Sequence, residues 1–122
     1  MPSRASSAKS TSRSTTRPVA VRVVLVTAPD LKHARRLARG ALKERLIACA
    51  TLVPRVESHY VWQGATEQSR EVLMILKTAP DRVAALENYV LANHPYDTPE
   101  FLVLPVTGAT RKYLAWVTHS VA

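Results

Sequence analysis

The sequence predicts an α+β fold in which a β-α-β unit occurs twice and both units share one antiparallel sheet. The tetrapeptide Thr-Ala-Pro-Asp occurs at residues 27–30 and again at 78–81. Each copy follows an apolar run and precedes a stretch with helical spacing. The 51-residue offset between the copies also places Leu-Val-Pro at 52–54 over Val-Leu-Pro at 103–105 without a gap. Two such units joined by a hairpin give the β-α-β-β-α-β order of a ferredoxin-like domain, here followed by a C-terminal helix.

The first unit begins with a buried strand and continues into an amphipathic helix. Residues 19–28 form a continuous β-branched run, which is typical of a buried strand. Residues 31–48 show helical spacing, and the apolar side chains expected to face the core are Leu31, Ala34, Ala38, Ala41 and Leu42. The opposite face is basic and carries Lys32, Arg35, Arg36, Arg39 and Lys43. Residues 49–54 and 55–64 are predicted to be extended, because apolar and polar side chains alternate along the second segment.

The second unit repeats this order. A turn at residues 63–69 is predicted to lead into a strand at 70–79. Residues 81–93 indicate a helix, residues 100–106 a strand and residues 108–121 a last amphipathic helix. The apolar stripe of the first of these helices consists of Val83, Leu86 and Val90. The helices are expected to cover one face of a four-stranded sheet and to leave the other face open.

Each Thr-Ala-Pro-Asp copy is interpreted as the end of a strand and the start of a helix. The Thr hydroxyl can cap a helix N-terminus, and Pro lacks the N–H that the first turn leaves without a partner. Asp is favourable at the positive end of the helix dipole. An anion site at the helix start is the alternative, but neither copy adjoins a glycine-rich loop that would let a phosphate approach.

The predicted central strands, residues 19–28 and 70–79, are apolar on both faces. An open sheet face of this kind would expose apolar surface to water in a monomer. We therefore expect other copies of the chain to bury the open face. The long hairpin within residues 49–79 reaches beyond a small sheet, as an oligomerising arm would.

The positive charge is concentrated near the N-terminus. Residues 1–18 contain no acid and hold half of the formal net charge of +8, through Arg4, Lys9, Arg13 and Arg17. This segment is rich in Ser and Thr and poor in apolar residues, so it is predicted to be a disordered tail, and residues 19–122 are predicted to form one domain. The tail weakly resembles an organellar transit peptide, but a solvated tail is the favoured interpretation.

The composition predicts a cytoplasmic protein without a membrane segment. Cys49 is the only cysteine, so the chain cannot form an internal disulfide. A chain without disulfides fits a reducing cytoplasm. The sequence contains neither the apolar core of a signal peptide nor a run of about 18 apolar residues.

No spacing typical of catalysis or of a metal site occurs in the sequence, which lacks Cys-x-x-Cys, His-x-x-x-His, a Walker loop and a nucleophile elbow. His94 is the strongest candidate binding residue, because it lies in the proline-stiffened segment 93–100 between a helix and a strand. Oxygen ligands for a metal there would be Glu71, Asp97 and Glu100. The alternative for His94 is a structural role at a helix C-terminus, where the dipole favours imidazole.

The remaining histidines and the cysteine are interpreted without a chemical role. His33, His59 and His119 are expected to be solvated, and Cys49 starts an apolar segment where a buried, inert thiol is the default. Reading of RNA by the sheet face is not favoured, because the predicted central strands carry no aromatic side chain on which a base could stack. The basic helix and tail leave only nonspecific contact with polyanions.

Five blocks of the sequence together resemble the CutA divalent-cation-tolerance family. The blocks are VVLVTAPD, ERLIACATLVPRVESHYVWQG, EVLMILKT, HPYDTPEFLVLPV and YLAWV, in this order between about residues 19 and 121. The resemblance implies a homotrimer with a ferredoxin-like core, similar to PII signalling proteins. It also implies a non-enzymatic role in tolerance of divalent metals, with copper binding.

The resemblance further implies a copper site of one cysteine and two adjacent histidines. At these positions the present sequence has Val26, Asn93 and His94. Glu71 matches an acidic position near that site. His94 and Glu71 are therefore the expected metal-binding residues, and weak binding of copper or another divalent metal is expected.

Tyr96 and Glu100 are expected beside these two residues, in a cleft near a subunit boundary. The expected partners are other copies of the chain, with no specific nucleic acid and no membrane. A PII-like signalling or binding module for a small ligand or a partner protein is the alternative function.

Overall fold

The computed structural model describes residues 17–122, so almost all of the predicted disordered tail lies outside the described residues. The described chain forms a four-stranded antiparallel sheet in the order β2-β3-β1-β4. Its elements are β1 (Arg22–Ala28), α1 (Leu31–Lys43), β2 (Cys49–Trp62), β3 (Ala65–Thr78), the 3₁₀ turn η1 (Pro80–Arg82), α2 (Val83–Asn93), β4 (Leu102–Pro105) and α3 (Arg111–Ser120). This order confirms the predicted ferredoxin-like fold with its C-terminal helix.

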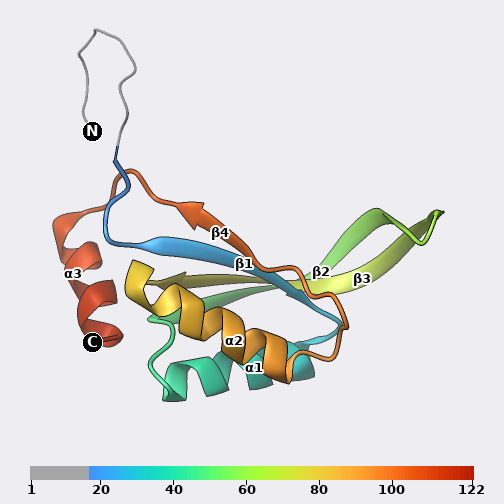
Figure 1. The fold of residues 1–122 in the computed structure, drawn as a ribbon, viewed down its shortest axis with the longest axis horizontal. Coiled ribbons are helices and arrows are strands. Elements are labelled where there is room, and N and C mark those ends of the chain that lie inside the picture. The colour runs from blue at the N-terminus through green and yellow to red at the C-terminus, as the bar shows by residue number, and fades with distance from the viewer. Residues whose placement is uncertain (1–16) are drawn as a thin grey trace, which may run out of the picture.

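The core lies between the sheet and the two helices α1 and α2, which lie on the same face (Figure 1). β1 shows the period of two that this burial requires, with Val24, Val26 and Ala28 fully buried. Leu86 and Val90 of α2 are buried opposite the sheet, as their spacing predicts. A second cluster joins α3 to the start of β1 through Val21, Val117 and Val121. Among residues 17–122, no helix combines the length and apolar character that a membrane crossing needs.

The first helix starts where the sequence predicts, but its cap is Asp30 and not Thr27. The Asp30 carboxylate accepts a hydrogen bond from the backbone N–H of His33 at 2.8 Å, and Asp30 has the extended backbone of an N-cap. Thr27 lies inside β1. Thr78 of the second copy is fully buried at the end of β3, and its hydroxyl donates to the carbonyl of Leu46 at 2.6 Å. The prediction of threonine caps is therefore wrong for both copies.

The predicted end of this helix at residue 48 is also wrong, because the chain leaves the helix after Lys43. Arg45 adopts the left-handed conformation, with φ of 57°. The N–H of Arg45 bonds the carbonyl of Leu42, and the N–H of Leu46 bonds the carbonyl of Ala41. These two bonds form a Schellman motif. Its usual glycine signal is missing here, because arginine occupies the left-handed position.

Packing of α1 corrects one predicted core residue. Leu42 is 42% exposed, whereas Leu37 is buried with only 2% exposed. Gly40 faces α2 and lies against the hydroxyl end of Tyr89. A side chain at position 40 would overlap that ring, so glycine permits the two helices to approach.

The hairpin is longer and more regular than the sequence predicts. Residues 49–62 form one strand with a bulge between Val53 and Val56, where Arg55 has φ of 62°. The predicted turn at 63–69 shrinks to Gln63 and Gly64, both with positive φ, as in a tight two-residue hairpin turn. β3 therefore begins at residue 65, and the distal hairpin projects past the helices (Figure 1). The smaller differences are that β1 starts at 22, β4 covers 102–105 and α3 covers 111–120.

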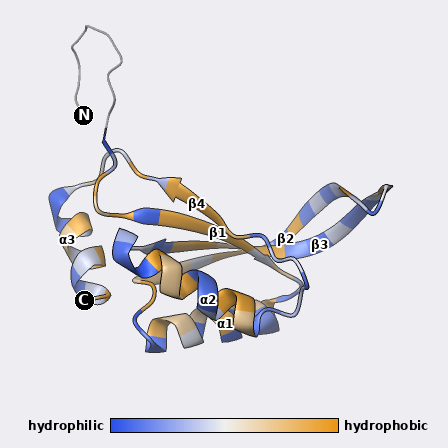
Figure 2. Ribbon diagram, viewed as in Figure 1, coloured by the Kyte–Doolittle hydropathy of each residue, from blue (hydrophilic) through white to orange (hydrophobic). Residues whose placement is uncertain are grey.

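The face of the sheet away from the helices and the outer edge are apolar. Leu25, Leu73 and Ile75 on the open face are only half-buried. Edge strand β4 exposes Leu102, Val103 and Leu104 by 52%, 43% and 41%, and most of the strand is coloured hydrophobic in Figure 2. This is the surface that the expected packing of other copies of the chain would cover.

Candidate functional site

A cleft of about 870 Å³ lies where the hairpin leaves the body of the domain. The hairpin contributes Tyr60, Trp62 and Glu71 to its lining, and the loop between α2 and β4 contributes Tyr96 and Glu100. A volume of this order suits a small ligand. The structure therefore brings Glu71, Tyr96 and Glu100 into one cleft, as predicted.

Glu71 is the buried acid of the cleft. It lies on β3 opposite Val56, directly after the bulge, and only 8% of it is exposed. The Tyr96 hydroxyl donates to Glu71 Oε2 at 2.8 Å. Burial raises the pKa of Tyr96, and the hydrogen bond to Glu71 and the charge of that carboxylate raise it further. The Tyr96 hydroxyl thus stays protonated and supplies a hydrogen bond to one oxygen of the buried Glu71 carboxylate.

Glu100 supplies a second carboxyl group to the same cleft. Burial raises the pKa of Glu100, and the negative charge of Glu71 raises it further. The charge of Glu71 thus acts on Glu100, and both carboxyl groups line the same cleft. The cleft therefore gathers acidic side chains in partly buried surroundings.

His94 lies behind this cleft and not in its lining. Its Nε2 bonds the carbonyl oxygen of Thr27 at 2.7 Å, and its Nδ1 accepts the backbone N–H of Tyr96 at 3.0 Å. A carbonyl can only accept, so Nε2 carries the proton. Both ring nitrogens are engaged within the protein, and His94 thereby joins the end of β1 to the loop that carries Tyr96.

The residues at the expected copper positions do not fit that metal. Val26 is fully buried and has no ligand atom, while the Asn93 amide donates to the carbonyl of Tyr89. Cys49 pairs with Lys77, which pairs with Val23 at the other end of β1 from Thr27. The four residue steps from Val23 to Thr27 separate the two levels by about 13 Å along the strand. In the described part of the chain, no cluster of three or more His, Cys, Asp or Glu side chains could hold a metal ion. The oxygen atoms of the cleft instead suit harder divalent cations.

Sequence reasoning did not place Tyr60 and Trp62 in the cleft. They are 42% and 48% exposed, and the Tyr60 hydroxyl donates to Ser69 on the facing strand at 3.3 Å. Their two-residue spacing puts both rings on one face of the hairpin, which is the only signal the sequence contains. His59, which directly precedes Tyr60, is exposed as predicted and bonds Glu57.

Comparison with known proteins agrees with the fold and with the five sequence blocks. The CutA1 divalent ion tolerance protein family matches residues 22–120. The divalent-cation tolerance protein CutA of Escherichia coli is 51% identical over 98 residues, which are 80% of this chain and 88% of that protein. The crystal structure of CutA1 from Oryza sativa is 42% identical, has a TM-score of 0.81, and is matched over 84% of this chain and 94% of its own.

A further solved structure comes from Archaeoglobus fulgidus and is described as the periplasmic divalent cation tolerance protein CutA. It is 31% identical with a TM-score of 0.81, and the match covers 84% of this chain and 99% of that chain. The family match spans far more than half of the sequence, and these relatives share its whole fold. The chain therefore belongs to the CutA1 divalent ion tolerance protein family.

Proposed function

We propose that this chain is a non-enzymatic divalent-cation tolerance protein that binds divalent metal weakly in the cleft. The observation that carries the proposal is that Glu71 and Glu100 line one cleft, where burial and then the charge of Glu71 raise the pKa of Glu100. A divalent cation between these groups would relieve both the burial of charge and the repulsion. The names of the relatives, which describe tolerance of divalent cations, support the same function.

The ligand set explains why binding is weak. The carboxyl groups of Glu71 and Glu100, the exposed Asp97 at the same cleft and the Tyr96 hydroxyl provide fewer ligands than a dedicated site for a hard cation. His94 is predicted as a ligand, but its imidazole would have to release Thr27 or Tyr96 to coordinate a metal. We therefore assign His94 the role of holding Tyr96 over Glu71, and Glu71 the role of direct ligand.

The cleft gives no support to catalysis. Its serines, Ser58 and Ser69, have no histidine as a hydrogen-bond partner among residues 17–122, and Ser69 accepts from Tyr60. A serine nucleophile needs a base within hydrogen-bond reach. His59, the histidine of the cleft, is bonded to Glu57.

We further propose that the functional unit is a homotrimer. The apolar edge strand β4 and the aromatic hairpin tip, where Val61 is 72% exposed, would be covered by neighbouring copies. Sedimentation equilibrium is expected to give the mass of three chains. A mass equal to one chain would refute this assembly.

We place the protein in the cytoplasm, where the single Cys49 thiol, which is free in the structure, stays reduced. One relative is described as periplasmic, so the periplasm is the alternative compartment. Cell fractionation distinguishes the two. Fractionation of cells that express the full chain is expected to recover it with cytoplasmic markers. Release of the protein with periplasmic markers would overturn this assignment.

A PII-like binding module is the second candidate, and the aromatic wall of the cleft favours it. Tyr60, Trp62 and Tyr96 offer apolar surface for a small organic ligand beside the carboxylates. A screen of thermal shifts separates the two functions. Stabilisation by metabolites and not by metals would favour the binding module.

Growth under metal stress tests the leading proposal. An Escherichia coli strain that lacks its own CutA would express this chain, its Glu71→Gln variant or its Glu67→Gln variant. Glu67 lies on the same strand at the exposed end of the hairpin and serves as the matched control. We expect the wild type and Glu67→Gln to restore growth at raised Cu(II) and Glu71→Gln to restore less. Failure of the wild type to restore growth would refute the tolerance function.

A further inference from the structure

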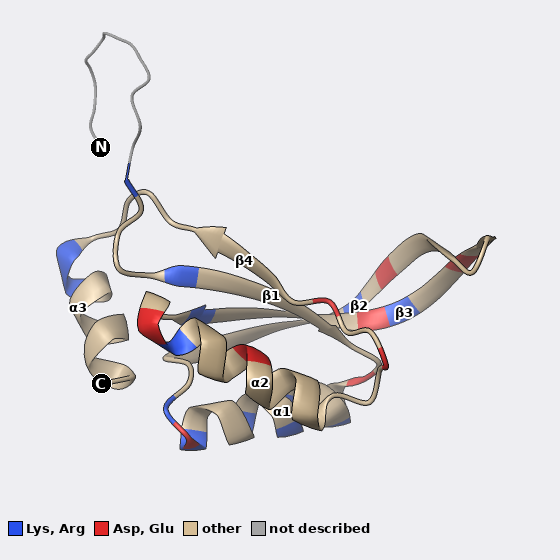
Figure 3. Ribbon diagram, viewed as in Figure 1, with Lys and Arg blue, Asp and Glu red and all other residues tan. Residues whose placement is uncertain are grey.

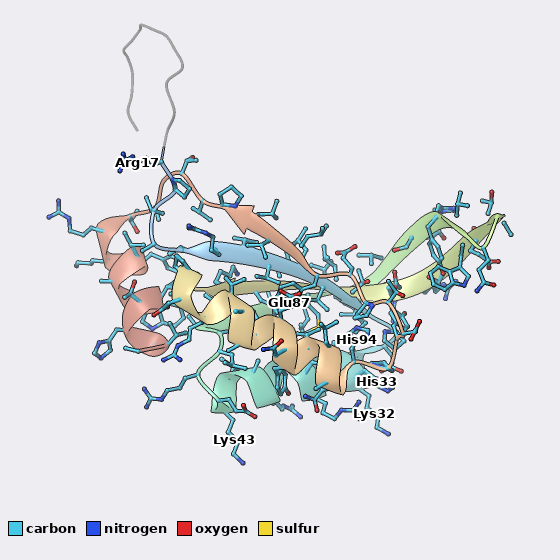
Figure 4. The ribbon with its side chains drawn as sticks, viewed as in Figure 1. Arg17, Lys32, His33, Lys43, Glu87 and His94 are labelled. Carbon is cyan, nitrogen blue, oxygen red and sulfur yellow. The ribbon has the colours of Figure 1, made fainter. Side chains whose placement is uncertain are left out.

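The outer face of α1 carries a row of basic side chains without a single acid. The helix exposes Lys32, Arg35, Arg36, Arg39 and Lys43, while its inner face is buried against the sheet. Lys32 and Lys43 extend from opposite ends of the helix and point away from the sheet (Figure 4). With a rise of about 1.5 Å per residue, the row is about 16 Å long.

This row holds the whole excess charge of the described domain. Outside α1, residues 17–122 contain nine basic and nine acidic side chains, which balance. The ion pairs within the described residues join histidines to acids, and none of them involves the five cations of α1. Figure 3 shows the contrast between α1 and α2, since α2 carries Glu87 and no basic residue. Ordinary protein surfaces intersperse both signs, so a segregated row is unusual.

The row also opposes the stability of the helix that carries it. Lys32–Arg36, Arg35–Arg39 and Arg39–Lys43 are like-charge pairs four residues apart, a spacing that brings their side chains together. The N-cap carboxylate of Asp30 offsets Lys32 at the positive end of the helix dipole, but α1 itself has no acid beside the four basic residues that follow. Helix formation therefore does not account for this arrangement, and a bound anion would relieve it.

We propose that this face of α1 binds the phosphate backbone of nucleic acid, without reading its sequence. Three of the five cations are arginines, whose planar guanidinium groups bond phosphate oxygens in pairs. A membrane surface fits less well, because the apolar side of an interfacial helix enters the lipid and the apolar side of α1 is buried in the core. The basic row lies on the helical layer, away from the apolar edge strand β4 (Figure 2). A neighbouring copy that packs against β4 would therefore leave the basic row accessible.

Fluorescence anisotropy with a labelled duplex of random sequence tests the proposal on the full chain. The test variant is Arg35→Gln/Arg36→Gln/Arg39→Gln, because Gln keeps the helix propensity and removes the charge. The matched control is Arg70→Gln/Arg111→Gln/Lys112→Gln, which removes three exposed charges outside α1. Both variants keep the basic N-terminal segment and have the same net charge.

The wild type is expected to bind the duplex with an affinity that falls steeply as salt rises from about 50 to 200 mM. The α1 variant is expected to lose roughly tenfold in affinity, and its slope of log K against log salt is expected to fall by about 2.7, at 0.9 per lost phosphate contact. Its melting temperature should equal or exceed that of the wild type, because like-charge pairs are removed.

Two outcomes would overturn the proposal. Equal losses in the α1 variant and the control would show that net charge or the N-terminal segment, and not α1, binds the duplex. Binding to vesicles of anionic phospholipid in preference to the duplex would assign the face to a membrane.

Discussion

The imidazole of His94 donates from Nε2 to the carbonyl oxygen of Thr27 at 2.7 Å and so joins positions 67 residues apart in the chain. Its other nitrogen accepts the N–H of Tyr96, whose hydroxyl donates to Glu71. The three bonds form one path from the end of β1 to the buried acid of the cleft. His94 thus controls the geometry of the site from behind it.

Replacing His94 by Ala is therefore expected to destabilise the fold and loosen the cleft. The part-buried carbonyl of Thr27 loses its donor from His94, and loss of such a hydrogen bond costs about 1 kcal/mol. Urea unfolding measures this loss, and His119→Ala on the exposed end of α3 is the control, expected to leave stability unchanged. Equal stability of His94→Ala and the wild type would show that the bond to Thr27 contributes nothing.

The raised pKa of Glu100 predicts a stability that depends on pH. The folded protein holds the Glu100 proton more tightly than the unfolded chain, so stability decreases as pH rises past the ordinary value of 4.5. Glu100→Gln removes this penalty. The variant is expected to melt at a higher temperature than the wild type at neutral pH and at the same temperature well below pH 4.5. A lower melting temperature of Glu100→Gln at neutral pH would contradict a cost of ionising Glu100 by burial and by the charge of Glu71.

Asp30 predicts the opposite dependence on pH. The backbone N–H of His33, followed by the His33 side chain, lowers the pKa of Asp30 below its ordinary value of 3.8. The stabilisation is therefore present above pH 3.8 and is lost as pH falls below it. Asp30→Ala should lower the melting temperature at neutral pH, and the difference from wild type should shrink in acid. Asp30→Asn keeps a cap without a charge and should retain most of the stability at neutral pH.

Gly40→Ala is expected to destabilise the protein, although alanine favours helices. The new methyl group would overlap the Tyr89 ring, and overpacking costs about 1–3 kcal/mol, against a gain of about 1 kcal/mol in helix propensity. Chemical denaturation of Gly40→Ala, Tyr89→Ala and the double variant measures the conflict. In the Tyr89→Ala background, Gly40→Ala should become stabilising. Destabilisation of equal size in both backgrounds would exclude the Tyr89 contact as the cause.

The sequence predicts most of the fold because its strongest signals are local. The repeated tetrapeptide marks both strand ends, a continuous apolar run identifies β1, and apolar periodicity identifies the buried side of α2. The end of α1 could not be predicted, because Arg45 occupies a position where glycine is the usual signal. The full length of β3 was missed because the hairpin arm is exposed and polar from Ala65 to Ser69, so burial imposes no pattern on it.

The site could be predicted in its composition but not in its bonding. Glu71, Tyr96 and Glu100 do line one cleft, as expected from the sequence. The role of His94 depends on Thr27, which only the folded sheet brings within hydrogen-bond distance. The contribution of Tyr60 and Trp62 depends on the path of the hairpin beyond the bulge at Arg55.

A metal titration of Glu71→Gln tests the central claim most directly. Calorimetry with Cu(II) and Mn(II) would compare the wild type with Glu71→Gln and the control Glu67→Gln; Mn(II) is included because exposed histidines hold it less well. The wild type and the control are expected to bind weakly, with a dissociation constant of about 0.1–1 mM, as for sites with few oxygen ligands. Glu71→Gln is expected to lose this binding for both metals. Identical isotherms for the wild type and Glu71→Gln would contradict a cation site at the buried acid of the cleft.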